Sequence, residues 1–302
     1  MRGSLAKDLV KEKSTNGAKI HPSNHTMLRN TIRSLLIFAF MVPFTAGTGA
    51  EYSWLKSDTA REALTERIQP PSGYRRVITD DPYAAWLRGL PLKPGRPFVY
   101  LHDGRRKSNQ SAHFAVIDMD VGPKDLQQCA DAIMRLRAEY QFSKGDWRNI
   151  RFNFTDGVPA RYALWRSGHR PRVRNGRKTA WLKRAKPDGS YAAFRKYMDV
   201  VFTYAGTYSL SREMKRVRPD QMRIGDVFIQ GGFPGHAVIV VDMAEHIATG
   251  KRIFLLAQSF MPAQEMHVLV NPNGNGPWYS LPVGDKLVTP EWDFKKGDLK
   301  RF

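Results

Sequence analysis

The chain has 302 residues, of which 42% are hydrophobic and 25% are charged. This composition can fill a sizeable core and excludes a disordered chain, while a mean hydropathy of −0.47 excludes a multi-span membrane protein. The formal net charge of +20 favours an anionic partner. Cys129 is the single cysteine, so no disulfide can form within the chain.

The N-terminal segment has the pattern of an export signal. Residues 35–46, LLIFAFMVPFTA, form an apolar run that is too short to span a bilayer comfortably. Arg29 and Arg33 precede the run and small residues follow it, which predicts a cleavable signal peptide at residues 27–50. We interpret residues 1–26 as a non-native or mis-started leader. We therefore expect export to the periplasm or the extracellular medium, with an uncleaved anchor as the alternative.

Helices and short strands are predicted to alternate in an N-terminal α+β subdomain, residues 51–189. The predicted helices are 54–68, 82–90 and one that runs from Gly122-Pro123 to about Phe142, and the predicted strands are 74–78, 98–101, 113–119 and 150–154. Because proline is favoured at the first helical position, the third helix would place Cys129 in its second turn. There it shares a face with Ile133 and Leu136. This position favours a packed, unreactive thiol.

Residues 161–186 are the most basic part of the chain, with ten Lys and Arg residues and no acid. The candidate binding residues in this segment are Arg170, Arg172, Arg174, Arg177 and Trp181. They suit an acidic polymer, with charges for its anionic groups and an aromatic ring for its sugars. Since export argues against nucleic acid, we expect an anionic envelope polymer or peptidoglycan as the partner. The alternative is a solvated hairpin without a ligand.

The remaining part, residues 190–302, is predicted to be β-rich, and the whole chain to be an α+β protein in which helices pack on an antiparallel sheet. A helix is expected over residues 190–205, followed by strands at 226–230, 236–242, 252–259 and 266–270. A symmetric hairpin of the second and third of these strands places Asp242 opposite Arg252 and His236 opposite Gln258. A His beside a carboxamide is the base and its orienting residue in a nucleophilic triad.

Two resemblances follow from these motifs. Gly225-Asp226-Val227-Phe228, followed by GHAVIV from Gly235 and a polar residue on the next strand, resembles the papain-like NlpC and CHAP cell-wall amidases over about residues 190–262. This resemblance implies a papain-like C-terminal half. Those amidases carry a Cys where the helix here begins with Ser190, which we expect to be a helix cap. The longer pattern QCADA, YAGT, GHAVIVVDM and QSFMPAQ is similar to a family of secreted bacterial proteins described as a domain of unknown function.

Two functional hypotheses remain open. The first is an exported basic cell-envelope protein of papain-like fold that is non-catalytic or degenerate and binds an anionic envelope polymer. The alternative is a cysteine hydrolase, an amidase or peptidase acting on cell-wall peptide or acyl bonds, with Cys129 as nucleophile, His236 as base and Gln258 as orienter. No cofactor is expected. A metal site would need His102, Asp103, His113 and Asp118, whose spacing matches no motif with a known mechanism.

Overall fold

A computed structural model describes residues 52–55, 61–174 and 178–302, apart from the side chains of Arg174 and Lys178. The predicted leader and signal peptide lie outside the described residues. The described residues form one compact unit. Its helices are α1 (Leu64–Arg67), α2 (Pro82–Arg88), α3 (Cys129–Ser143), α4 (Tyr162–Arg166), α5 (Tyr191–Tyr204) and α6 (Thr207–Glu213). In the described part of the chain, none of the helices is long and apolar enough to cross a membrane.

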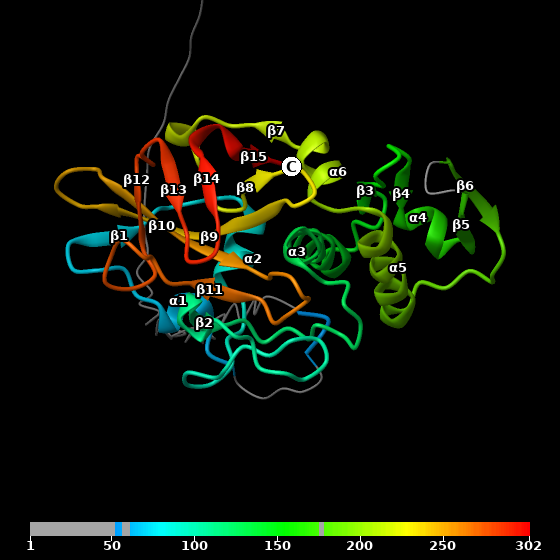
Figure 1. Cartoon of the computed structure of the whole chain (residues 1–302), viewed down its shortest axis with the longest axis horizontal. Helices are drawn as coiled ribbons and strands as arrows, with labels where there is room; N and C mark the ends of the chain where they lie inside the picture. The colour runs from blue at the N-terminus through cyan, green and yellow to red at the C-terminus, as the bar shows by residue number, and fades with distance from the viewer. Residues whose placement is uncertain (1–51, 56–60, 175–177) are drawn as a thin grey trace, which may run out of the picture. The chain divides into compact units, whose positions relative to one another are not determined.

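The centre of the fold is an antiparallel sheet, shown in Figure 1, to which nine strands of the described residues contribute. Its order is β2 (His113–Val116), β11 (His267–Leu269), β10 (Arg252–Gln258), β9 (His236–His246), β8 (Val227–Gln230), β15 (Leu299–Arg301) and β7 (Lys215–Arg216). In addition, β1 (Tyr74–Arg76) pairs with β9, and β12 (Tyr279–Leu281) pairs with β10. Helices together with antiparallel sheets confirm the α+β class.

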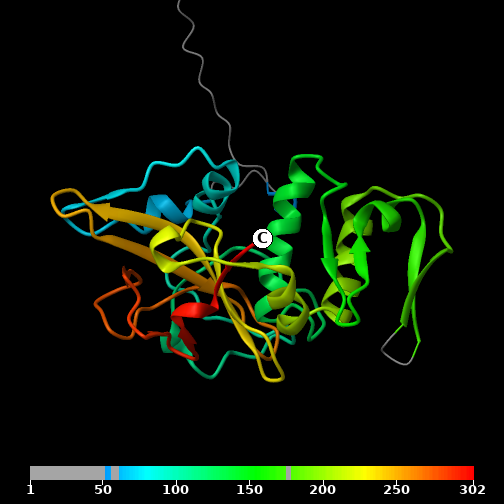
Figure 2. The ribbon, with the colours of Figure 1, turned by 90° about the horizontal axis from the view of Figure 1, so that it is seen from above.

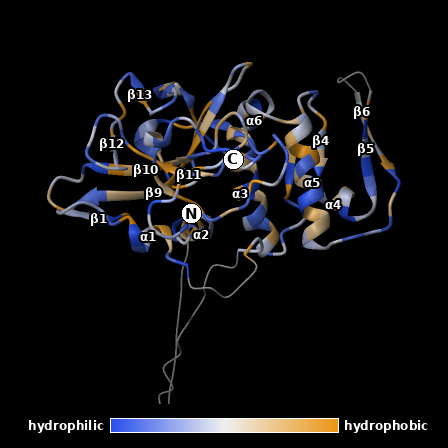
Figure 3. Cartoon of the chain, turned by 60° about the horizontal axis from the view of Figure 1, so that its bottom comes forward, coloured by the Kyte–Doolittle hydropathy of each residue, from blue (hydrophilic) through white to orange (hydrophobic). Residues whose placement is uncertain are grey.

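Three hairpins of the described residues lie outside this sheet. They are β3 (Arg151–Asn153) with β4 (Pro159–Arg161), β5 (His169–Arg174) with β6 (Lys178–Lys183), and β13 (Lys286–Val288) with β14 (Asp293–Lys295). The views in Figures 1 and 2 agree that β5 and β6 lie beyond α5, away from the central sheet. Figure 3 shows the hydrophilic colouring of β5, which agrees with its basic sequence. Within residues 161–186, β5 and β6 form a hairpin and α4 forms the start of the segment.

Helix α3 is the central helix of the unit and packs against β9 and α5 (Figure 2). It is buried on more than one side, as expected of a helix inside a core rather than on its surface. Its apolar residues Ile133 and Leu136 are fully buried. The buried Arg135 forms an ion pair with Glu139, with Nε and Oε1 3.2 Å apart, and the Tyr191 hydroxyl donates to the same Glu139 oxygen at 2.7 Å.

The prediction that this helix begins at Pro123 is wrong, because α3 begins at Cys129. Gly122 has a φ of +81°, and the following residues form a turn rather than a helix. The backbone N–H of Gln128 donates to Asp131 Oδ2 at 3.1 Å, which caps the helix at this point. Cys129 is therefore the first helical residue and does not lie in a second turn.

Other predicted elements are shorter than expected or missing. Of the helix predicted over residues 54–68, residues 56–60 lie outside the described ranges, and the described part is helical only over α1. The strand predicted at residues 98–101 is wrong: Tyr100 and Leu101 form isolated bridges with Arg106 and Gln264. The predicted helix over residues 190–205 is confirmed as α5, and the four C-terminal strands are confirmed as β8, β9, β10 and β11.

The predicted register of the β9–β10 hairpin is also wrong. Arg252 pairs with Glu245, a shift of three residues, since β9 continues to His246. A β-bulge between Leu255 and Leu256 then reduces the shift to two residues, so that Ala257 pairs with Ile239. An even shift leaves each side chain on its predicted face. His236 and Gln258 therefore still share a face, although they are not directly opposite.

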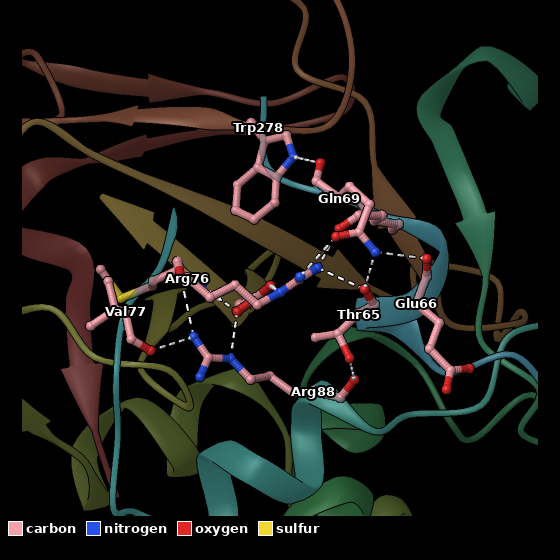
Figure 4. Close-up of polar contacts among 10 residues, drawn as sticks. Thr65, Glu66, Gln69, Arg76, Val77, Arg88 and Trp278 are labelled. Carbon is pink, nitrogen blue, oxygen red and sulfur yellow. Dashed lines mark hydrogen bonds and ion pairs between the residues drawn. The ribbon is translucent and has the colours of Figure 1, made fainter. Parts of the chain in front are cut away.

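Asp242 does not pair with Arg252 as predicted but is the fully buried centre of another network. It accepts from Arg76 Nε at 2.9 Å and from Arg88 Nε at 2.6 Å. Figure 4 shows both arginines converging from β1 and α2, with further bonds from Arg76 to the carbonyl of Thr65 and from Arg88 to that of Val77. This network ties the first segments of the chain to β9.

Strands from both sides of residue 190 share the central sheet, since β1 and β2 precede this residue and their partners β9 and β11 follow it. The predicted boundary between residues 189 and 190 therefore runs through a common sheet. The two halves bury one continuous hydrophobic core.

Candidate active site

Cys129 lies where the start of α3 meets the start of β9. As the first helical residue it is 4% exposed, and its thiol donates to the carbonyl oxygen of Gly235, with Sγ and oxygen 4.0 Å apart. Gly235 immediately precedes His236, the first residue of β9. The fold thus brings the Cys129 thiol to the backbone of the residue before His236, more than 100 residues away in the sequence, while the structure shows no hydrogen bond between this thiol and the His236 ring.

His236 and Gln258 form the predicted pair. Both side chains are fully buried, and His236 Nε2 lies 2.8 Å from Gln258 Oε1. The other ring nitrogen of His236, Nδ1, is buried and has no hydrogen-bond partner. Because an amide oxygen can only accept, Nε2 carries the proton and Nδ1 is left as an unprotonated base.

The orientation of the Gln258 amide is set by Glu291, a residue that the sequence analysis did not identify. Gln258 Nε2 donates to Glu291 Oε2 at 2.7 Å, and its second proton faces His267 Nε2 at 3.4 Å. Glu291 in turn accepts from Lys107 Nζ at 2.7 and 2.8 Å, and both side chains are nearly buried. Since a carboxylate cannot donate, Glu291 forces the amide oxygen of Gln258 toward His236.

Aromatic rings enclose this pair. The ring centroid of His236 lies 4.7 Å from that of Phe260, 5.4 Å from that of Trp292 and 5.8 Å from that of Phe294. Trp292 and Phe294 come from the turn and second strand of the β13–β14 hairpin, which also carries Glu291. This hairpin therefore supplies both the apolar cover and the acid that orients Gln258.

The apolar surroundings keep the Cys129 thiol and the His236 imidazole neutral. Burial raises the pKa of the Cys129 thiol to about 12; the Asp131 carboxylate adds to this rise, and nearby backbone N–H groups oppose it. Burial lowers the pKa of His236 to about 4, and the charge of Lys107 acts in the same direction while the Gln258 hydrogen bond opposes it. At neutral pH the site therefore holds a thiol and a neutral imidazole.

A pocket of about 240 Å³ opens beside Cys129. Gly235 lines it, whereas the buried His236 does not. Two carboxylates, Asp125 and Asp131, and the apolar side chains of Phe233 and Met261 contribute to its wall, and none of the described lining residues is Lys or Arg. The pocket is thus acidic and apolar in a chain whose net charge is +20.

A comparison with protein families assigns the chain to one family. A family model described as Domain of unknown function (4846) matches residues 64–301. The chain belongs to this family. The matched range includes Cys129, His236 and Gln258. A search of curated proteins and a search of solved structures each found no significant match.

Several predicted binding residues of the basic segment are engaged within the protein. Arg170 places its guanidinium over the Trp165 ring, 3.9 Å from the centroid, and donates to the Trp165 carbonyl. Trp181 stacks on Phe154, with centroids 6.3 Å apart. Arg172 is exposed on β5. The side chain of Arg174 and the whole of Arg177 lie outside the described residues.

Two other sequence-based expectations concern Ser190 and a metal. Ser190 Oγ accepts from the N–H of Ala193 at 3.2 Å, which confirms it as the cap of α5. His102 and His113 contact the carbonyls of Pro123 and Pro97, respectively. In the part of the chain that the structure describes, no group of three or more His, Cys, Asp or Glu side chains is placed to hold a metal ion.

We expect stability to fall as the pH drops below 6.5. Burial lowers the pKa of His236 to about 4 and that of His267 to about 3, whereas both rings titrate near 6.5 in the unfolded chain. The unfolded state therefore binds more protons between these values, so the contribution is complete above 6.5 and is lost as pH falls toward the folded pKa. The expected loss between pH 7.5 and 5.0 is roughly 2 kcal/mol for each ring.

Urea unfolding at these two pH values measures the loss. In the variant His267→Gln the difference between the two pH values should change by the contribution of this ring, about 2 kcal/mol, because the ring is gone. Buried acids with a raised pKa, such as Asp131, act in the opposite direction, so the comparison with the variant decides: an unchanged pH difference in His267→Gln would contradict the burial of a neutral imidazole at this position.

Proposed function

We propose that the protein is an exported cysteine hydrolase of papain-like architecture. Cys129 is the nucleophile, His236 the general base and Gln258 the residue that orients His236. The observation that supports this proposal best is the position of Cys129 as the first residue of α3, beside the end of β9 that carries His236. The alternative of a packed, unreactive thiol loses its second-turn argument, because Cys129 is the first helical residue, but keeps the burial of the side chain in its favour.

The chemistry follows from the protonation states of the pair. His236 Nδ1 has no hydrogen-bond partner in the structure, so in the proposed reaction it would take the thiol proton of Cys129 through one water molecule or after a shift of the side chains, as Sγ forms a bond to the carbonyl carbon of the substrate. The imidazolium then gives this proton to the leaving amine or alcohol as its bond to carbon breaks. A water molecule, deprotonated by the same Nδ1, hydrolyses the resulting thioester and regenerates the thiol.

The start of α3 suits the developing negative charge on the substrate oxygen. The first backbone N–H groups of a helix have no carbonyl acceptor within the helix, and here they belong to Cys129, Ala130 and Asp131. All three residues line the pocket. They are therefore the candidate donors to the oxyanion, and the partial positive charge of the helix end acts in the same direction.

We infer the substrate class from the expected export to the cell envelope and from the resemblance to cell-wall amidases. A signal peptide at residues 27–50 would deliver the enzyme to the cell envelope, where peptidoglycan offers peptide and amide bonds. The apolar wall at Phe233 and Met261 and the carboxylate of Asp125 would then contact the groups beside the cleaved bond.

Thiol labelling tests the proposal. The native protein is treated with iodoacetamide at pH 7, and the rate of Cys129 alkylation is compared with that of His236→Ala. We expect the variant to react at least about tenfold more slowly, because it lacks the base that removes the thiol proton. Ser190→Ala is the matched control and should label at the unmodified rate. Equal rates with and without His236, or labelling that requires unfolding, would refute a catalytic Cys129.

A further inference from the structure

A second pocket lies on the basic side of the molecule, near α4 and the β5–β6 hairpin. Its volume is about 800 Å³. The cationic side chains that line it are Arg148, Arg166 and Lys183, and its aromatic wall is Trp147. Neither Cys129 nor His236 lines this pocket, so it is separate from the candidate active site.

Arg166 is held in place without an acidic partner. Its guanidinium lies over the Trp147 ring, 3.8 Å from the centroid, and its Nε is buried without a hydrogen-bond partner. It also packs against Gly189, where an added Cβ would come within 2.5 Å of Nε. A fixed guanidinium with an unused donor is preorganised for an anionic ligand.

The surrounding charges are not neutralised within the protein. No ion pair is formed by the described Lys and Arg side chains of residues 161–186. The two acids of the pocket serve local bonds: Asp146 accepts from Asn149, and Asp188 accepts from the N–H of Ser190. The excess positive charge is therefore available to a ligand.

The shape and the aromatic residues narrow the ligand class. A volume of about 800 Å³ greatly exceeds that of a single small anion and suits a ligand that has bulk between its charged groups. Nucleic acids need free aromatic faces on which bases stack. Here Arg166 covers one face of the Trp147 ring, Arg170 covers one face of the Trp165 ring, and Phe154 covers one face of the Trp181 ring. This arrangement disfavours a nucleic acid as the ligand.

We propose that this pocket binds an acidic polysaccharide. Arg166, Arg148 and Lys183 pair with carboxylates on successive sugars, and the carboxylates of Asp146 and Asp188 accept from sugar hydroxyls. The site goes beyond the proposed hydrolysis and does not depend on it. Its effect is to hold the protein on an anionic polymer while the acidic pocket beside Cys129 remains free.

The test measures binding of the full chain to end-labelled oligogalacturonate by fluorescence anisotropy. Arg166→Gln should weaken binding about tenfold, as expected for the loss of a charge-assisted contact. Gly189→Ala retains every charge but displaces Arg166, and should weaken binding severalfold. Arg216→Gln removes the same charge from an exposed position on β7 outside the pocket, and should change affinity less than about twofold.

Two further comparisons complete the experiment. Lys183→Gln removes an exposed charge of the pocket, should weaken binding severalfold, and does not threaten the fold. Cys129→Ala should bind like the unmodified protein, which separates this site from catalysis. Equal losses for Arg166→Gln and Arg216→Gln, comparable binding of an uncharged oligosaccharide, or tighter binding of polyphosphate or single-stranded DNA would overturn the proposal.

Discussion

Replacement of Cys129 by alanine is expected to reduce hydrolysis at least about 10³-fold, and His236→Ala to a similar degree. Residues of a nucleophilic triad act as a unit, so the removal of either one costs nearly as much as the removal of both. The measurements are the release of p-nitrophenol from p-nitrophenyl acetate and the appearance of new amino groups in digested peptidoglycan. The double variant Cys129→Ala/His236→Ala should therefore hydrolyse the substrate no more slowly than the less active of the two single variants.

The matched control for this experiment is Ser190→Ala. Ser190 is the other candidate nucleophile that the resemblance to cell-wall amidases suggests, but its hydroxyl caps α5. Its removal should cost about 1 kcal/mol of stability and leave hydrolysis unchanged. Full activity of Cys129→Ala, or loss of activity in Ser190→Ala with the fold intact, would show that the nucleophile has been wrongly assigned.

The pairing of His236 with Gln258 could be predicted from the sequence because it depends on alternation rather than on exact register. Side chains of a strand alternate between two faces, so an even shift of pairing leaves them on the same face. The bulge between Leu255 and Leu256 turns an odd shift into an even one. The predicted contact between His236 and Gln258 therefore forms although the predicted loop length is wrong, whereas the predicted Asp242–Arg252 pair does not form.

The position of Cys129 was missed because two helix-start signals compete. Gly122-Pro123 is a common start, but proline is equally acceptable in a turn, and the positive φ of Gly122 serves that turn. The correct signal is Asp131, an acid three residues after Gln128 that bonds back to its N–H. An acid at this spacing could have placed the helix start at Cys129 and favoured the enzyme hypothesis from the sequence alone.

Other residues of the site could not be recognised from a local sequence pattern. Glu291 and Lys107 are separated by 184 residues, and each lies in a stretch without a recognisable motif. Their contact exists because the β13–β14 hairpin folds over the ends of β9 and β10. Likewise, the tryptophans of the basic segment could be expected near its charges, but which ring faces are covered depends on packing partners such as Phe154 and Trp147.

Glu291→Leu is expected to lower kcat/KM for hydrolysis by about 10² to 10⁴-fold, although Glu291 does not contact Cys129. Without the carboxylate, the Gln258 amide can rotate and offer its NH₂ group to His236 Nε2. That ring nitrogen then becomes the acceptor and Nδ1 carries the proton, so the base toward Cys129 is lost. Stabilisation of the wrong tautomer in a serine protease has an effect of this size.

The conservative variant Glu291→Gln separates orientation from charge. A glutamine at position 291 can still accept from Gln258 Nε2 through its amide oxygen, so most of the activity should remain. The ¹⁵N chemical shifts of His236 report the tautomer directly: Nε2 should stay protonated in Glu291→Gln and lose its proton to Nδ1 in Glu291→Leu. An unchanged tautomer in Glu291→Leu would contradict the positioning role.

Loss of stability must be distinguished from loss of catalysis, because Glu291→Leu leaves Lys107 as a buried unpaired charge. Removal of one partner of a buried ion pair costs about 3 to 5 kcal/mol, whereas replacement of both partners by apolar residues is often neutral. The double variant Lys107→Met/Glu291→Leu should therefore unfold at nearly the urea concentration of the unmodified protein. It should remain as inactive as Glu291→Leu, because Gln258 still lacks the acceptor that fixes its amide; recovery of activity together with stability would reduce Glu291 to a structural residue.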